Sequence, residues 1–137
     1  MPNLKGGEAV GFGTQIPSAS WDELASDIKS GKIWGLYIIE RDLKKIWKTE
    51  TAQLLSGLDL VVFQGPNKGE TGSLAHYRLP ATAYVEEDGH FTNFEGKVQA
   101  YGKALEPLGS ARPDWKIFQE LKAAWMKTPA TANGAKR

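Results

Sequence analysis

The sequence predicts an α/β domain: a small Rossmann-like parallel sheet flanked by helices, with an irregular loop and hairpin region and a C-terminal helix. Two continuous apolar runs, 33–39 (IWGLYII) and 58–64 (LDLVVFQ), have the length and composition of strands that are buried on both faces. The segment 42–56 between them has helical length and pattern, which favours parallel pairing through a right-handed crossover. An apolar stripe within 114–126 predicts the closing helix.

The clearest helix is predicted over residues 20–29. Ser20 can cap it and Glu23 stands three residues later, which is the pattern of a capping box. The helix has one apolar stripe, made by Trp21, Leu24, Ala25 and Ile28. Trp21 could in principle be a binding platform, but its place in this stripe favours a core anchor.

The helix predicted over residues 42–56 has an insecure boundary. Its inward positions are Leu43, Ile46, Trp47, Leu54 and Leu55. Thr49 could instead cap a separate second helix. After the strand at 58–64, residues 70–75 predict a short helix and 77–79 a third strand.

The stretch 79–99 predicts two turns, at Asp88-Gly89 and at Glu95-Gly96, with a strand between them. We expect Gly89 and Gly96 to adopt positive φ, which residues with a β-carbon resist. Asn93 is expected to bond backbone groups inside the bend, as asparagine does in turns.

Length and composition bound the class of protein. The 137 residues predict one domain over 20–126, preceded by an extended Gly-rich arm (1–19) and followed by a disordered tail (127–137). The chain has no cysteine, which excludes disulfides, iron–sulfur ligation and a thiol nucleophile within it. A net charge of +1 argues against nucleic acid as a partner.

Location is predicted from two missing signals. No apolar run approaches the roughly 20 residues that span a bilayer, and residues 1–13 lack the apolar core of a signal peptide. We therefore expect a cytoplasmic location without direct membrane insertion.

No catalytic or metal-binding residue is predicted. Glu86, Glu87 and Asp88 could do acid–base work or bind a cation, but a solvated turn is the favoured interpretation. His76 and His90 are isolated and lack ligand spacing, and His90 is expected in a solvated turn.

Four pieces of the sequence resemble the molybdopterin oxidoreductase superfamily, and most closely the large iron–sulfur subunit of NADH–quinone oxidoreductase, the respiratory complex I. They are 58–64 (LDLVVFQ), 79–81 (LPA), 86–99 (EEDGHFTNFEGKVQ) and 104–121 (ALEPLGSARPDWKIFQEL). The resemblance covers only a fragment of the family and none of its cysteine-rich part. It implies that redox centres reside elsewhere and that the partners are iron–sulfur and NADH dehydrogenase subunits.

Departures from the family pattern bear on cofactor binding. Gln64-Gly65 stands where the family has Gln-Asp, and Gly69 replaces a threonine. The resemblance leaves Gln64, Thr71 and Asn93 as candidate contacts to molybdopterin guanine dinucleotide. Losing polar anchors at this strand end disfavours a buried nucleotide.

Three functional hypotheses follow from the resemblance. The first is a non-catalytic structural domain or split subunit of an NADH–quinone oxidoreductase in electron transport, similar to its large iron–sulfur subunit, peripheral to the inner membrane and with no cofactor in this chain. The second is part of a molybdenum or tungsten bis-pterin enzyme, formate dehydrogenase-like, in which the chain helps to close the cofactor site. The third is a stand-alone interaction module.

Overall fold

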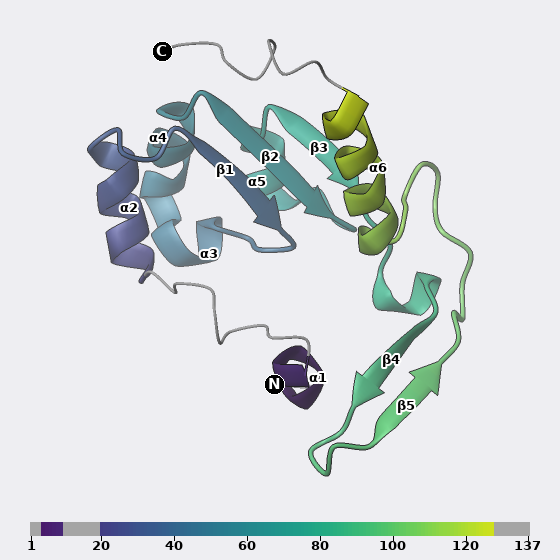
Figure 1. Cartoon of the computed structure of the whole chain (residues 1–137). Coiled ribbons are helices and arrows are strands. Elements are labelled where there is room, and N and C mark those ends of the chain that lie inside the picture. The colour runs from purple at the N-terminus through teal and green to yellow at the C-terminus, as the bar shows by residue number, and fades with distance from the viewer. Residues whose placement is uncertain (1–3, 10–19, 128–137) are drawn as a thin grey trace.

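The computed structural model describes residues 4–9 and 20–127, and its centre is a three-stranded parallel sheet (Figure 1). The strands are β1 (Gly35–Ile39), β2 (Leu60–Gly65) and β3 (Tyr77–Pro80), in the order β1-β2-β3. Tyr37 is opposite Val62, which in turn is opposite Tyr77. The predicted α/β class and the parallel pairing of the first two strands are confirmed.

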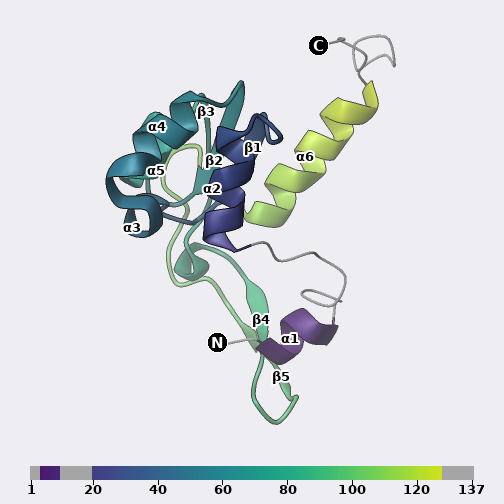
Figure 2. The same ribbon diagram turned by 90° about the vertical axis from the view of Figure 1, so that its left-hand side faces the viewer.

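Helices cover the two faces of the sheet unequally. Those that precede and connect the strands lie together on one face, while the C-terminal helix α6 (Asp114–Lys127) is the one described helix on the other (Figures 1 and 2). The first group comprises α2 (Trp21–Lys29), α3 (Lys44–Trp47), the 3-10 turn η1 (Lys48–Glu50), α4 (Thr51–Ser56) and α5 (Gly69–Leu74). No helix in the described part of the chain is long and apolar enough to cross a membrane.

The first long helix, α2, begins as the sequence predicts. Ser20 Oγ accepts a hydrogen bond from the Glu23 amide at 3.1 Å, and Glu23 Oε2 accepts from the Ser20 amide at 2.7 Å. This capping box satisfies two donors that the helix start would leave open. Trp21 stays partly exposed and meets the Trp47 ring edge-on, with centroids 6.1 Å apart. Trp21 therefore packs at the edge of the hydrophobic core and not at its centre.

The segment 42–56 is broken in two. Lys48 has a φ of 48°, which ends α3, and the chain passes through η1 before α4 begins at Thr51. The buried Thr51 hydroxyl donates to the Lys48 carbonyl at 3.0 Å. Two helices, the alternative interpretation of the sequence, are confirmed, but Thr51 rather than Thr49 stabilises the junction.

The hydrophobic core lies between the sheet and these helices. Its centre is formed by Ile28, Ile38, Leu43, Trp47, Leu54, Leu55, Leu58, Val61 and Phe63. Side chains alternate across a strand, so Tyr37 and Ile39 of β1 point to the opposite face. They remain 40% and 45% exposed. The prediction that β1 is buried on both faces is wrong, because α6 is the only helix among the described residues that packs on that face.

Residues 89–101 form an antiparallel hairpin of β4 (Gly89–Thr92) and β5 (Val98–Tyr101). Asn93 Oδ1 accepts from the amides of Glu95 at 3.0 Å and Lys97 at 2.9 Å, as the sequence predicts. Gly96 has a φ of 87°, also as predicted. The prediction for Gly89 is wrong: it has no positive φ. A β-carbon there would instead collide with the Tyr101 ring, which stacks on Phe91 with centroids 4.7 Å apart.

The hairpin extends away from the sheet and has α1 (Leu4–Ala9) beside β4 (Figures 1 and 2). The structure thus contains a helix within residues 1–19, where the sequence predicts an extended arm. The predicted tail lies outside the described residues except for Lys127, which ends α6.

Replacing Gly96 by valine should destabilise the protein by about 1–3 kcal/mol, because a β-branched residue resists a φ of 87°. Nothing lies within 4 Å of the added β-carbon, so backbone strain rather than crowding causes the loss. Gly96→Asn should cost much less, since asparagine tolerates this conformation. His90→Ala, at an exposed strand position, should change little. Urea denaturation of the three variants checks this, and equal stability of the Val and Asn variants would contradict it.

Candidate functional site

The candidate site is the edge of the sheet where all three strands end. In open parallel sheets ligands bind outside this carboxyl edge. Glu40 leaves β1 with a φ of 52°, and its amide donates to the Gln64 carbonyl at 2.8 Å. The Ala81 amide, just after β3, donates to the Gly65 carbonyl at 3.2 Å. These backbone bonds bring the three strand ends together.

Gln64 lies at the centre of this edge and is 0% exposed. Its Oε1 accepts a hydrogen bond from the Tyr37 hydroxyl, and its Nε2 donates to Asp114 Oδ1 at 2.6 Å. A buried amide needs such partners, because leaving either end without one costs about 1–3 kcal/mol. The Tyr37 ring also stacks on Phe118, with centroids 6.0 Å apart. We call this set Tyr37–Gln64–Asp114 the amide bridge, since it joins β1, β2 and α6.

Carboxylates surround the amide bridge. Burial raises the pKa of Glu40, and the nearby charges of Asp114 and Glu87 raise this pKa further. Burial and, to a smaller extent, Asp114 also raise the pKa of the Tyr37 hydroxyl. Burial and the neighbouring carboxylates thus both oppose ionisation of these two side chains. Despite its acidity, the described part of the chain contains no group of three or more potential metal ligands.

Thr71 has a structural environment on α5. It is 1% exposed, and its hydroxyl accepts from the Leu43 amide at 2.8 Å while donating to Asp42 Oδ1 at 2.8 Å. These two hydrogen bonds tie α5 to the loop that follows β1. The hydroxyl therefore already has both a donor and an acceptor as partners.

The structure does not assemble the three candidate contacts, Gln64, Thr71 and Asn93, into one site. Their side chains bond to separate sets of partners, and Asn93 lies in the turn of the β4–β5 hairpin. Gln64 and Thr71 lie near the carboxyl edge but bond to different partners, and each end of the Gln64 amide already has a hydrogen-bond partner.

The acidic run 86–88 bonds locally. Glu86 Oε2 accepts from the Ala83 amide at 2.8 Å, and Asp88 Oδ1 accepts from the Lys103 amide at 2.9 Å. Glu87 differs from the expected solvated position: it is half-buried and accepts from the hydroxyl of the buried Thr82 at 3.0 Å. His76 is likewise structural, because its Nδ1 accepts from the Val61 amide at 2.9 Å.

Sequence reasoning missed Tyr37, Glu40 and Asp114 as members of this edge. Tyr37 is hidden in an apolar run, and Asp114 has the ordinary position of an acidic residue in a first helical turn. Asp114 is separated from Gln64 by 50 positions. A local sequence pattern cannot predict a contact between residues so far apart. The contact becomes visible only when α6 is seen packed on the sheet.

The fold and the edge define a Rossmann-like α/β domain whose carboxyl edge carries three interacting carboxylates and is bonded within the chain. A family model described as molybdopterin oxidoreductase matches residues 8–124. The chain therefore belongs to the molybdopterin oxidoreductase family, and the superfamily resemblance of the sequence is confirmed.

Three relatives are similar to this chain. NADPH-Fe(3+) oxidoreductase subunit alpha of Geobacter sulfurreducens is 32% identical over 115 residues, covering 80% of this chain and 14% of the relative. The Bacillus subtilis protein named "Putative formate dehydrogenase YrhE" is 38% identical over 115 residues, covering 80% and 12%. A Staphylococcus aureus protein with the same formate dehydrogenase description is 37% identical over 117 residues, also covering 80% and 12%.

Two facts follow from these relatives. The chain spans about one-seventh or less of their length. None of the three is named as a component of NADH–quinone oxidoreductase, so the finer resemblance stays a proposal.

The described residues at the carboxyl edge do not fit the diphosphate of a pterin dinucleotide. The polar side-chain atoms of Gln64 and Thr71 already form hydrogen bonds within the chain. Glu40, Glu87 and Asp114 interact electrostatically there and would repel a phosphate. No chemical step is therefore assigned to such a group in this domain.

Thr71→Val should lower the free energy of unfolding by about 1–3 kcal/mol, because the change leaves the Leu43 amide without its partner. Thr71→Ser keeps the hydroxyl and should cost clearly less. Chemical denaturation of both variants measures the difference. If the valine variant is as stable as the wild type, the hydroxyl is not a structural tie and becomes available as a ligand contact.

Proposed function

We propose that the chain is a non-catalytic scaffold domain of a formate dehydrogenase-like oxidoreductase of the molybdopterin family. The observation that carries this proposal is the amide bridge. At the strand end where the family resemblance implies cofactor contacts, the Gln64 amide is wholly buried and bonded to Tyr37 and Asp114. The domain uses this edge to hold its own helix α6.

The redox centres lie outside these 137 residues in this proposal. The chain contains no cysteine and therefore offers no thiolate ligand to an iron–sulfur cluster. Its relatives named as formate dehydrogenases are about eight times its matched length, which leaves ample chain for such centres. The domain's work is then to pack against cofactor-bearing parts and to fix their positions.

A second candidate host is an NADH–quinone oxidoreductase, in which the chain would belong to the large iron–sulfur subunit and have iron–sulfur and NADH dehydrogenase subunits as partners. The observation in its favour is the composition of the carboxyl edge. Gly65 and Gly69 stand where the family resemblance expects an aspartate and a threonine, so two side chains that could anchor a nucleotide are missing. The scaffold role is the same in both candidates, and only the host differs.

Purification of the native assembly tests the proposal. The full chain would carry an affinity tag in the cells that encode it, and the purified assembly would be analysed for metals, formate oxidation and NADH–quinone reduction. We expect stoichiometric molybdenum or tungsten together with formate-dependent dye reduction. NADH–quinone reduction by an assembly that contains neither molybdenum nor tungsten would favour the second candidate host. An assembly without redox subunits would overturn both.

A further inference from the structure

One face of the sheet is only partly covered. A parallel sheet of this class is ordinarily packed by helices on both faces. Here α6 is the one helix on its face within the described residues (Figure 2). The side chains of β1 that point to this side, Tyr37 and Ile39, therefore remain partly open to solvent.

Aromatic side chains of α6 extend this open surface. Trp115, Phe118 and Trp125 are spaced three and seven residues apart, so they lie on neighbouring parts of one helical side. They are 63%, 45% and 68% exposed. Phe118 stacks on Tyr37, which places this side of α6 next to β1. We call the five residues Tyr37, Ile39, Trp115, Phe118 and Trp125 the β1–α6 apolar face.

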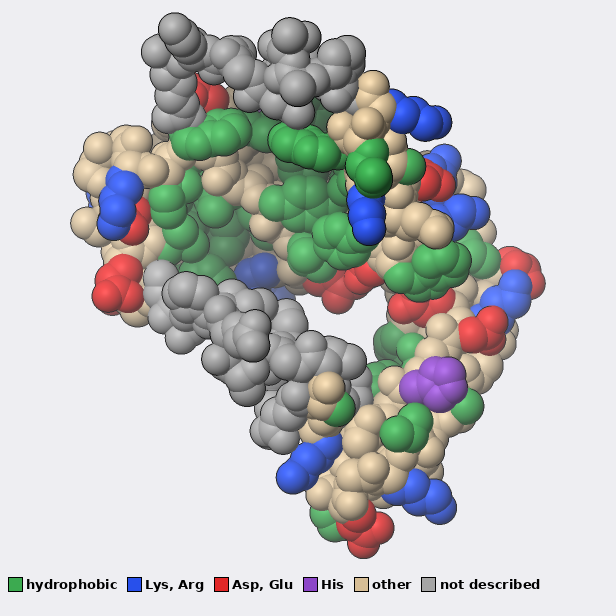
Figure 3. All heavy atoms as spheres, viewed as in Figure 1, with side chains coloured by type: hydrophobic (Ala, Val, Ile, Leu, Met, Phe, Trp, Pro, Cys, Tyr) green, Lys and Arg blue, Asp and Glu red, His purple; other side chains and the backbone are tan. Residues whose placement is uncertain are grey.

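The space-filling view shows how these side chains gather. Hydrophobic side chains form a broad patch over β1, between α2 and α6 (Figure 3). Monomeric proteins seldom leave so many large aromatic side chains exposed together, and such patches mark interaction sites. Tryptophan and tyrosine are also the residues that contribute most to binding energy in interfaces.

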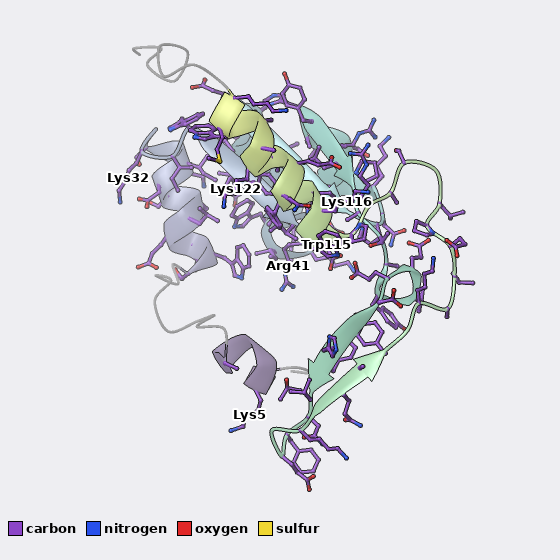
Figure 4. The ribbon with its side chains drawn as sticks, turned by 45° about the vertical axis from the view of Figure 1, so that its right-hand side comes forward. Lys5, Lys32, Arg41, Trp115, Lys116 and Lys122 are labelled. Carbon is purple, nitrogen blue, oxygen red and sulfur yellow. The ribbon has the colours of Figure 1, made fainter. Side chains whose placement is uncertain are left out.

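Cations border the β1–α6 apolar face. Lys122 lies one helical turn beyond Phe118, and Arg41 follows the end of β1 (Figure 4). Both are exposed, and neither forms an ion pair with another residue in the described part of the chain. An apolar centre with a charged rim is the usual anatomy of a protein interface. Carboxylates lie along the same border, since Glu40 precedes Arg41 and Asp114 precedes Trp115, so the rim carries both signs of charge.

The amide bridge gives this face a fixed shape. Asp114 at the start of α6 accepts a hydrogen bond from Gln64, so a shift of α6 on the sheet would break this part-buried bond. A surface that is already ordered loses little conformational entropy when a partner binds. The face is therefore suited to permanent packing.

We propose that the β1–α6 apolar face docks onto an apolar surface with a mixed-charge rim on the host oxidoreductase's remaining polypeptide. This inference rests on the proposed function and names the surface through which it is performed. The chain spans only 12–14% of the length of its relatives, so the rest of such an oxidoreductase supplies far more surface than this domain. The missing helical layer is then provided by the host.

Site-specific cross-linking tests the surface directly. A photoreactive phenylalanine would replace Trp125 in the tagged full chain, expressed in the native cells. The matched control carries it at Phe94, which is 85% exposed in the hairpin turn. We expect a cross-link from position 125 to a redox subunit of the purified assembly and none from position 94. A cross-link between two copies of the chain, or one from position 94 alone, would overturn the inference.

Charge and size variants provide the second readout. Trp125→Glu and Lys122→Glu should reduce recovery of the host subunits by about tenfold or more, whereas Phe94→Glu and Lys97→Glu should leave it within about twofold. All four side chains are exposed, so thermal melts should confirm intact folding. Full recovery with every variant would overturn the inference.

The two proposals fail in distinguishable ways. A metal-containing, formate-oxidising assembly that resists Trp125→Glu and gives no cross-link from position 125 refutes this surface but keeps the proposed function. An assembly without redox subunits refutes the proposed function itself, and the docking inference with it.

Discussion

The buried amide of Gln64 is the interaction on which the arrangement of this domain depends. Three elements distant in sequence, β1, β2 and α6, meet through its two polar atoms. Because a buried amide without partners is costly, the position of α6 is fixed by hydrogen bonding as well as by apolar contact. The stacking of Tyr37 on Phe118 works in the same direction, since one residue of the bridge supplies both contacts.

This bridge has opposite consequences for two surfaces. At the carboxyl edge it uses the polar atoms that could otherwise bind a ligand, and the carboxylates of Glu40, Glu87 and Asp114 make the same edge unfavourable for phosphate. On the sheet face it holds a single helix in place and leaves aromatic side chains beside it open to solvent. Both consequences support the proposed scaffold role.

Local patterns predicted much of this fold and little of the candidate site. The capping box of Ser20 and Glu23, the parallel strand pair and the Asn93 turn all depend on residues close in sequence or on connection length. The exposure of β1 depends on how many helices reach its far face, which periodicity does not report. Gly89 shows the same limit, because its partner Tyr101 is set by the hairpin register rather than by its neighbours. The amide bridge could not be predicted from the sequence, because Gln64 and Asp114 are 50 positions apart and come into contact only in the folded structure.

A double-mutant cycle on Gln64 and Asp114 tests the role of the amide bridge most directly. The variants Gln64→Leu, Asp114→Ala and the double substitution would be compared by urea denaturation of the full chain. If the bridge holds α6 on the sheet, each single change should cost about 1–3 kcal/mol, and the pair should show a coupling of about 0.5–3 kcal/mol. Additive effects, within about 0.5 kcal/mol, would show that the two residues act independently and that their hydrogen bond does not hold α6 on the sheet.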